Sequence, residues 1–333
     1  MKRLTGLLVV LSIAPLLHAW DYEGHRMVNH LAFDALPQDF PAFARTPEAR
    51  ERVAFLAGEP DRWRNSTNAA ARHSANSEHF IDLDDLPLFG LQREQLTPFR
   101  YDFMAMLGEG RTRNATNFAS LDPARDADHT RRLVGFLPWA INDGFAKIES
   151  AFAYLRELES AGTRDEIAEA RQNVIYLMGV FGHYVGDAAQ PLHTTRHFNG
   201  WIGPNPNHYR TKPTIHSWID GGFIKASRIM DEALRPQMRP ARALWSVSPT
   251  NAFPEALRFI VEQEKLVETV YMMDRDGALS PDNPKGAEGK AFIEKQLVTG
   301  AQFLGDLWYS AWKNAPPDTF LRKELARRKG GNP

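Results

Sequence analysis

The segment from Val174 to Ala188 constrains the fold of this chain more than any other, because it is apolar on nearly every side and yet carries His183 and Asp187. These two residues are four apart, so on a helix their side chains project from one face, one turn apart. An ionised carboxylate in apolar surroundings is strongly unfavourable unless it is paired or bound to a cation. The sequence therefore predicts a buried helix whose carboxylate is neutralised by a positive partner, and a bound cation would meet this requirement.

Several other segments have apolar residues at helical spacing, and none shows the sustained alternation of period two that is typical of strands. The 333-residue chain is long enough for one large domain or two ordinary ones, and it contains no internal repeat or low-complexity linker that would divide it. We therefore predict an all-α fold, a single mostly helical domain with long loops. The apolar stripes predict helices around residues 141–155, 166–188, 255–273 and 293–311, and the Pro-, Asn- and Gly-rich stretches predict loops at 86–128, 194–214 and 239–254.

The first nineteen residues have the composition of an export signal. Lys2 and Arg3 precede a short apolar run from Leu7 to Leu17, and Ala19 is a small residue suited to cleavage. The run is shorter than the roughly 20 apolar residues of a membrane-spanning helix, so we expect no stable membrane anchor. We predict cleavage between Ala19 and Trp20 and an exported protein, periplasmic or secreted.

Composition narrows the choice of partners and ligands. The 40 Lys and Arg residues nearly balance the 41 Asp and Glu residues, so the chain has no strongly basic field that would hold a nucleic acid through phosphate contacts alone. It contains no cysteine, so neither disulfides nor thiolate metal ligands are available, and rigidity must come from core packing or bound metal. We divide the chain into a signal peptide (1–19), a helical domain (20–321) and a basic, solvated tail (322–333).

Histidine and aspartate recur at spacings that suit a metal site. His216 and Asp220 repeat the four-residue spacing of the pair on the apolar helix, and His193 follows a helix-ending proline in Gln190-Pro191-Leu192-His193. Neutral imidazoles and carboxylates are ligands that zinc prefers, and a set of nitrogen and oxygen donors without thiolate is typical of catalytic zinc. Further candidates of these two residue types are His25, Asp61 and His79.

These residues resemble those of the phospholipase C/P1 nuclease superfamily, and more closely those of its S1/P1 nuclease branch. The resemblance runs from Trp20 to about Ile224 and is densest from Phe181 to Asp220. It implies a mostly helical fold with three zinc ions in one cleft, one of them bound by the free α-amine and carbonyl of an N-terminal tryptophan. The chain departs from the family pattern at Glu59-Pro60 and between Arg196 and Trp201, around the cleft rather than at the ligands.

The resemblance implies nine metal-ligating residues in three groups, with Asp187 as a carboxylate that bridges the first two ions. The first group is Trp20 and His25, the second is Asp61, His79 and His183, and the third, more distant, is His193, His216 and Asp220. A free α-amine has a pKa of about 7.7 to 8.0, low enough for zinc to displace its proton near neutral pH. Protein with an uncleaved signal should therefore lack the first site.

The same resemblance assigns roles beside the metals. Arg64 would lie beside the scissile phosphate and, with Asp187, form the catalytic set. Phe80 and Asp82 would receive an unpaired base, and because a duplex hides the faces of its bases, single strands should be preferred. The alternative for Phe80 is packing in the core. Trp201 and Tyr209, on the loop between His193 and His216, are candidate walls of the substrate pocket.

The function that we expect is hydrolysis of single-stranded DNA or RNA, and of 3′-nucleotides, to 5′-phosphate products by a zinc-activated hydroxide. Two alternatives remain, a zinc phospholipase C that cleaves phospholipid headgroups and an exported zinc-binding protein without catalysis. Asp220 favours the nuclease, because the phospholipase branch has glutamate there. Arg64 argues against simple zinc binding, because a cation beside a zinc cluster hinders metal binding unless an anion lies between them. The sequence implies no obligate protein partner and leaves the oligomeric state open.

Overall fold

The computed structural model describes residues 20–244 and 251–330, so the predicted export signal, residues 1–19, lies outside the described residues. Over the described ranges the chain is helical and has no β-strand, only an isolated bridge between Ile81 and Gly135, which confirms the predicted all-α fold. None of the helices in these ranges is both long enough and apolar enough to cross a membrane.

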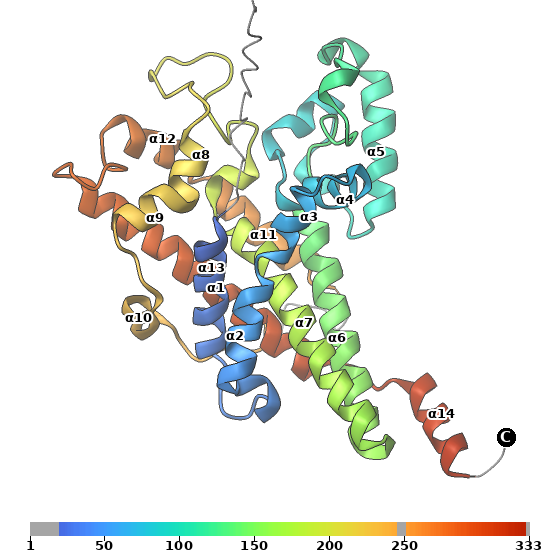
Figure 1. Cartoon of the computed structure of the whole chain (residues 1–333). Helices are drawn as coiled ribbons and strands as arrows, with labels where there is room; N and C mark the ends of the chain where they lie inside the picture. The colour runs from blue at the N-terminus through green and yellow to red at the C-terminus, as the bar shows by residue number, and fades with distance from the viewer. Residues whose placement is uncertain (1–19, 245–250, 331–333) are drawn as a thin grey trace, which may run out of the picture.

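The α-helices differ greatly in length, and the longest form the centre of the bundle (Figure 1). The helices are α1 (Tyr22–Asp34), α2 (Pro47–Leu56), α3 (Glu59–Arg64), α4 (Ala69–Ala75), α5 (Arg100–Arg113), α6 (Leu137–Ala161), α7 (Arg164–Ala188), α8 (Ile215–Ser217), α9 (Phe223–Ala226), α10 (Asp231–Leu234), α11 (Phe253–Glu264), α12 (Val267–Arg275), α13 (Gly286–Asn314) and α14 (Thr319–Lys329).

The core lies where α6, α7 and α13 meet, with α1 and α2 packed against α7. The α6 and α7 helices run antiparallel side by side, because only two residues separate the end of one from the start of the other (Figure 1). Both apolar stripes that predicted α6 and α13 face the core, which confirms these two helices. Their buried members are Ile141, Phe145, Ile148, Phe152 and Leu155 on α6, and Ile293, Leu297, Ala301, Leu304, Trp308 and Ala311 on α13.

Local signals fix both ends of α7, the helix that carries His183 and Asp187. It begins with a capping box, in which the Thr163 hydroxyl accepts a hydrogen bond from the Glu166 amide and the Glu166 carboxylate accepts one from the Thr163 amide. It ends at Ala188, shortly before Pro191. Both metal-ligand candidates therefore lie in the last two turns of α7, at the end of the bundle where α1 and α3 also approach.

The close approach of α1 to α7 depends on glycine. A Cβ atom at Gly182 would lie only 1.9 Å from Oδ1 of Asn29 on α1, and one at Gly186 would lie 2.9 Å from Nδ1 of His25. Asn29 is fully buried, and its Nδ2 donates to the carbonyls of Val53 on α2 and Gly179 on α7, at 2.9 and 3.0 Å. A single amide thus joins three helices, and the glycines leave room for it.

The predicted secondary structure differs from the structure in two segments. The stretch 86–128, expected to be a loop, contains the 14-residue helix α5, which buries only Phe103, Leu107 and Gly110 and so presents too narrow an apolar stripe to be recognised. The helix expected over 255–273 is divided into α11 and α12 at residues 265 and 266. The stretch 194–214 has no α-helix, as expected, and only its first residue, Thr194, belongs to the preceding 3-10 turn, Pro191–Thr194.

The C-terminal segment is also more ordered than predicted. Residues 322–329, expected to form a solvated tail, belong to α14, which projects from the bundle beside the far end of α6 (Figure 1). Leu321 and Leu325 are buried, and the Arg322 guanidinium makes a two-pronged ion pair with Glu157 on α6. These contacts are tertiary and leave no periodic signal in a segment with so few apolar residues.

One buried acid in α6 makes stability depend on pH. Glu149 is 4% exposed, its Oε1 atom has no hydrogen-bond partner among the described residues, and burial raises its pKa to about 7. Because this folded-state pKa lies above the unfolded value, near 4.5, the folded state holds its proton more tightly. Stability contributed by the neutral carboxyl is therefore complete below about pH 4.5 and is lost as the pH rises through about 7.

We expect Glu149→Gln to unfold at a higher urea concentration than the wild type at pH 8, and to differ from it far less at pH 5, because the amide resembles the protonated carboxyl and cannot ionise. The measurement is urea denaturation followed by circular dichroism at both pH values. Glu159→Gln, on the exposed side of the same helix, is the matched control and should show no such gain. An equal effect of Glu149→Gln at both pH values would contradict the explanation.

Candidate metal centre

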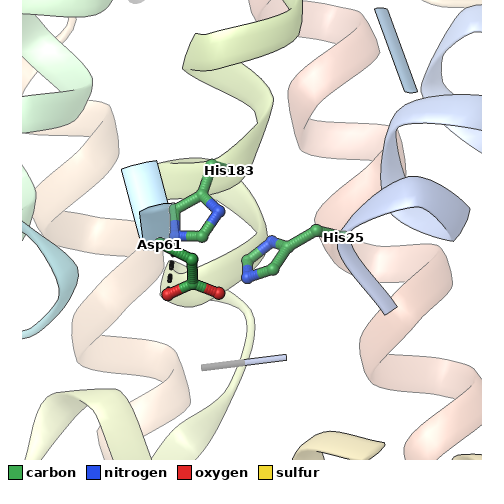
Figure 2. A group of neighbouring side chains, drawn as sticks. All are labelled: His25, Asp61 and His183. Atoms are coloured by element: carbon green, nitrogen blue, oxygen red, sulfur yellow. Dashed lines mark ion pairs between the residues drawn. The ribbon is translucent and has the colours of Figure 1, made fainter. Parts of the chain in front are cut away.

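Three helices bring together one buried group of candidate ligands, which combines a residue assigned by the resemblance to the first ion, His25, with two that it assigned to the second, Asp61 and His183. His25 on α1, Asp61 on α3 and His183 on α7 point toward one another, with the ion pair between Asp61 and His183 drawn as a dashed line (Figure 2). All three are buried, and one donor atom from each lies within 4.8 Å of the others. The His25 and His183 rings stack with their centroids 3.8 Å apart. This separation follows from the glycine-dependent contact of α1 with α7.

Asp187 lies at the centre of the surrounding imidazoles and is fully buried. Its Oδ1 atom is 3.4 Å from Nε2 of His25, and its Oδ2 atom is 3.0 Å from Nδ1 of His79 and 3.3 Å from Nε2 of His183. The two oxygens thus face different imidazoles, as a bridging carboxylate must. His79, His183 and Asp187 form a second buried group that could hold a metal ion.

The third group consists of His193, His216 and Asp220, as the resemblance implied. His193 is in the short 3-10 turn Pro191–Thr194, and Nε2 of His216 lies 3.1 Å from Nε2 of His193 and 2.9 Å from Oδ2 of Asp220. Asp220 belongs to a π-helical turn, Trp218–Gly222. Such turns are rare and occur frequently at functional sites.

Backbone carbonyls determine which nitrogen of three imidazoles carries the proton. Nδ1 of His183 donates to the Ala57 carbonyl at 2.7 Å, Nδ1 of His193 to the His79 carbonyl at 2.6 Å, and Nδ1 of His216 to the Phe198 carbonyl at 3.2 Å. A neutral imidazole has one donor nitrogen, so each Nε2 then presents a lone pair. This second contact is what metal-ligating histidines usually make.

Lone pairs that face one another require a positive charge between them. In the third group, the two Nε2 atoms are 3.1 Å apart and a carboxylate oxygen is 2.9 Å from one of them. Several buried nitrogen and oxygen atoms that could bind a metal also lack any hydrogen-bond partner among the described residues. Leaving such an atom without a partner costs about 1–3 kcal/mol unless something else binds it. These atoms are Nδ1 and Nε2 of His25, Oδ1 of Asp61, Nε2 of His79, Oδ1 of Asp187 and Oδ2 of Asp220. The donors therefore fit a metal ion.

The electrostatics keep most of the imidazoles neutral, the form in which they bind metal. Burial, assisted by the nearby Arg64 guanidinium, lowers the pKa of His79 and of His216 to about 4. Burial alone would raise the pKa of Asp187, but His183 and His193 hold it well below its usual range. The pKa of Asp220, in contrast, is raised well above its usual value by burial. Without a cation, the third group is therefore the less favourable place for a charged carboxylate.

The residue that follows the predicted cleavage site lies against the centre. Trp20 is fully buried, and its indole Nε1 donates to the Gly186 carbonyl at 2.8 Å, next to Asp187 in the chain. The amide of Asp21 donates to the Asp220 carbonyl at 3.0 Å. The start of the described chain thus touches α7 and the π-helical turn, between the groups that contain Asp187 and Asp220.

Arg64 borders the centre, and the two predicted base-binding residues follow His79 in the chain. Arg64 ends α3, one turn after Asp61, and its Nε atom is 3.8 Å from Oδ1 of that aspartate. Phe80 is half-buried and follows His79 directly. Asp82 lies near two further aspartates, and burial, together with these neighbours, raises its pKa well above the usual value. Between them, the amide of Ile81 donates to the His193 carbonyl at 2.9 Å.

The two predicted pocket walls occupy different environments. Trp201 is half-buried and stacks on His197 with the ring centroids 4.1 Å apart. Tyr209 is only 4% exposed, packs against Trp201 and Tyr271, and donates its hydroxyl to Glu268 at 2.8 Å. Tyr209 thus anchors the 195–214 loop from inside, a position that the sequence did not predict because its partners lie on α12.

Two buried residues next to the ligands were not predicted. Gln190 donates from Nε2 to Oδ1 of Asp220 at 2.8 Å and accepts from the Leu192 amide at 2.6 Å, so it holds one oxygen of Asp220 and leaves the other to face His216. Tyr184 donates its hydroxyl to Glu78 at 3.1 Å, and its ring meets His79 and His183 edge-on. No spacing rule marks either residue, although both adjoin ligands in the sequence.

Neither models of known protein families nor characterised proteins match this chain. What the site could bind is inferred from its own imidazole nitrogens and carboxylate oxygens. Three buried groups of histidine and aspartate residues could hold metal ions, with nitrogen and oxygen as the only donor types.

We expect the chain that begins at Trp20 to gain thermal stability from added zinc, by about 2.7 kcal/mol at a free concentration one hundred times the dissociation constant. Asp187→Asn should bind fewer equivalents, because it keeps the size of the side chain and removes the charge that faces three imidazoles. The measurements are elemental analysis after dialysis and calorimetric unfolding. His73→Gln, an exposed histidine outside the centre, is the control. Full metal content in Asp187→Asn would contradict this assignment.

Proposed function

We propose that this protein is an exported, zinc-dependent phosphodiesterase of the S1/P1 nuclease type that hydrolyses single-stranded nucleic acid. The observation that carries the proposal is the combination of three buried His and Asp groups with a guanidinium at their edge. Arg64 is paired with Asp61 at 3.8 Å, and a guanidinium beside a metal centre also suits the binding of a substrate anion. A phosphodiester is an anion of the right chemistry, because its oxygens accept bidentate hydrogen bonds from arginine.

Zinc is the ion that we propose, because its usual ligands are the imidazole and carboxylate donors found here. Close zinc ions, when bound, supply Lewis acidity that brings the pKa of a water molecule toward 7 and so provides hydroxide near neutral pH. His25, Asp61, His79, His183 and Asp187 would hold the two close ions with Trp20, and His193, His216 and Asp220 would hold the third.

The protein's own residues would position the substrate. Arg64 would bind the equatorial oxygens of the phosphate and stabilise the charge that develops on them. Its Nε atom is 3.8 Å from Oδ1 of Asp61, which ties the guanidinium to one of the candidate metal ligands. Phe80 would stack on an unpaired base, and Asp82 would meet the edge of that base. Because the Ile81 amide is bonded to the His193 carbonyl, this base-binding segment is fixed relative to the third group.

We expect Arg64→Ala to lower kcat/KM on single-stranded DNA by about 10²–10³, the usual effect of removing one donor to a developing oxyanion. The zinc content should stay unchanged, since Arg64 donates no metal ligand. The measurement is release of acid-soluble nucleotides by the zinc-loaded chain beginning at Trp20, with duplex DNA of the same sequence as the second substrate. Arg62→Ala is the matched control, because Arg62 lies on the same short helix, is 67% exposed and pairs with Glu59.

Two outcomes would contradict the proposal. Unchanged hydrolysis in Arg64→Ala would remove the guanidinium from the reaction. Faster release of phosphocholine from lecithin than of nucleotides from single-stranded DNA would assign the centre to phospholipids instead.

A further inference from the structure

A long groove lies on the surface between α6 and α7, next to the metal centre. One cavity of about 850 Å³ is bordered by Trp63, Tyr101, Lys147, Tyr176 and Tyr184, among others. A second cavity of about 690 Å³ shares Asp143, Lys147, Tyr176 and Leu177 with the first and extends to Tyr154. We call the two together the α6–α7 groove. The groove runs along α6 from residue 140 to residue 154, on the order of 20 Å of helix. This length exceeds that of a single nucleotide.

The groove shares a wall with the candidate metal centre. Tyr184 lines the groove, and the edge of its ring meets the rings of His79 and His183 at centroid distances of 5.8 and 5.6 Å. Glu78 and Trp63 also line it, and each directly precedes a residue of the centre in the chain. The groove thus begins one side chain away from His79 and His183, within the span of a strand that has one phosphate at the centre.

Exposed aromatic rings gather along this groove. Tyr101 is 86% exposed, Phe99 67%, Tyr154 43% and Tyr176 40%, and all four line one or both of the cavities. Single exposed rings are common on protein surfaces, but a row of them along one depression marks a binding surface. Rings in such a row are platforms on which successive unpaired bases stack, whatever the sequence of the bases.

The polar groups of the groove favour a nucleotide over an acyl chain. The side-chain oxygens of Asn142 and Asn251 accept hydrogen bonds from backbone amides, which leaves each Nδ2 as a donor. Arg100 pairs with both acids of the groove, Glu78 and Asp143, and balances one of their two negative charges. Lys147 makes no ion pair within the described part of the chain. Flat rings, amide donors and one ammonium group suit bases linked by phosphates, whereas an acyl chain needs aliphatic walls without charge.

We propose that the α6–α7 groove binds the part of a single-stranded nucleic acid that extends away from the phosphate at the metal centre. This inference rests on the proposed function, because it takes the bound chain to be the substrate of that centre. It adds that the preferred substrate is a strand of several nucleotides rather than a dinucleotide, and that Tyr101, Tyr176 and Lys147 supply this preference.

The test compares oligothymidylates of 2, 4, 8 and 12 residues as substrates of the zinc-loaded chain that begins at Trp20. The double variant Tyr101→Ala/Tyr176→Ala should raise KM for the 12-residue strand at least about tenfold and leave the dinucleotide unchanged, because two stacking platforms are lost. Lys147→Gln should reduce the slope of log affinity against log salt concentration by about 0.7, the value for one phosphate contact on a single strand. Phe320→Ala, which removes a 74% exposed ring on α14 outside both cavities, is the control.

Binding is also measured directly, by fluorescence anisotropy of a labelled 12-residue phosphorothioate strand and by sedimentation with phosphatidylcholine vesicles. If no oligonucleotide is hydrolysed, the proposed function fails, and weaker strand binding by the double variant than by Phe320→Ala would still support the groove. If hydrolysis occurs and the double variant matches the wild type at every length, the groove inference is overturned while the function stands. Vesicle binding that the double variant loses, without strand binding, would also overturn the inference.

Discussion

The carboxylate of Asp187 is the constraint on which the rest of this structure depends. It is fully buried at the C-terminal end of α7, where the helix itself contributes partial negative charge. Such a group is tolerated only beside a positive charge or hydrogen-bond donors, and His25, His79, His183 and His193 all approach it to within 3.6 Å. Because burial lowers the pKa of His25, His79 and His193, a cation bound among these imidazoles would supply the missing positive charge. These four residues come from α1, α7 and two short 3-10 segments. The packing of the bundle around this end of α7 is therefore inseparable from the neutralisation of one charge.

The sequence predicted the parts of the centre that depend on local geometry. Residues four apart share a face of any helical turn, so His183 with Asp187 and His216 with Asp220 could be paired before their surroundings were known. The second pair keeps this relation although Asp220 lies in a π-helical turn. The buried faces of α6 and α13 were also predictable, because apolar residues at helical spacing indicate which side of a helix faces the core.

What the sequence could not predict depends on contacts between distant segments. The carbonyls of Ala57, His79 and Phe198 fix the tautomers of three histidines, and a backbone acceptor has no signature in a side-chain pattern. Gln190 reaches across to Asp220, which is thirty residues further along the chain. Tyr209 was predicted as a pocket wall because it is an aromatic residue on the loop between two ligands. In the structure it is buried by contacts with residues of α12, which the local sequence does not reveal.

The close packing of α1 against α7 has a consequence for which cations could bind. A Cβ atom at Gly182 or Gly186 has no room, and Asn29 joins both helices to α2, so the two helices that present His25 and His183 cannot move apart without breaking several contacts. A cage whose walls are locked in this way has a fixed aperture. Calcium, which takes six to eight oxygen ligands at 2.3–2.6 Å, needs more donors and a more yielding shell than this one offers. Rigid helix packing would thus make the site selective for the size of any cation that binds there.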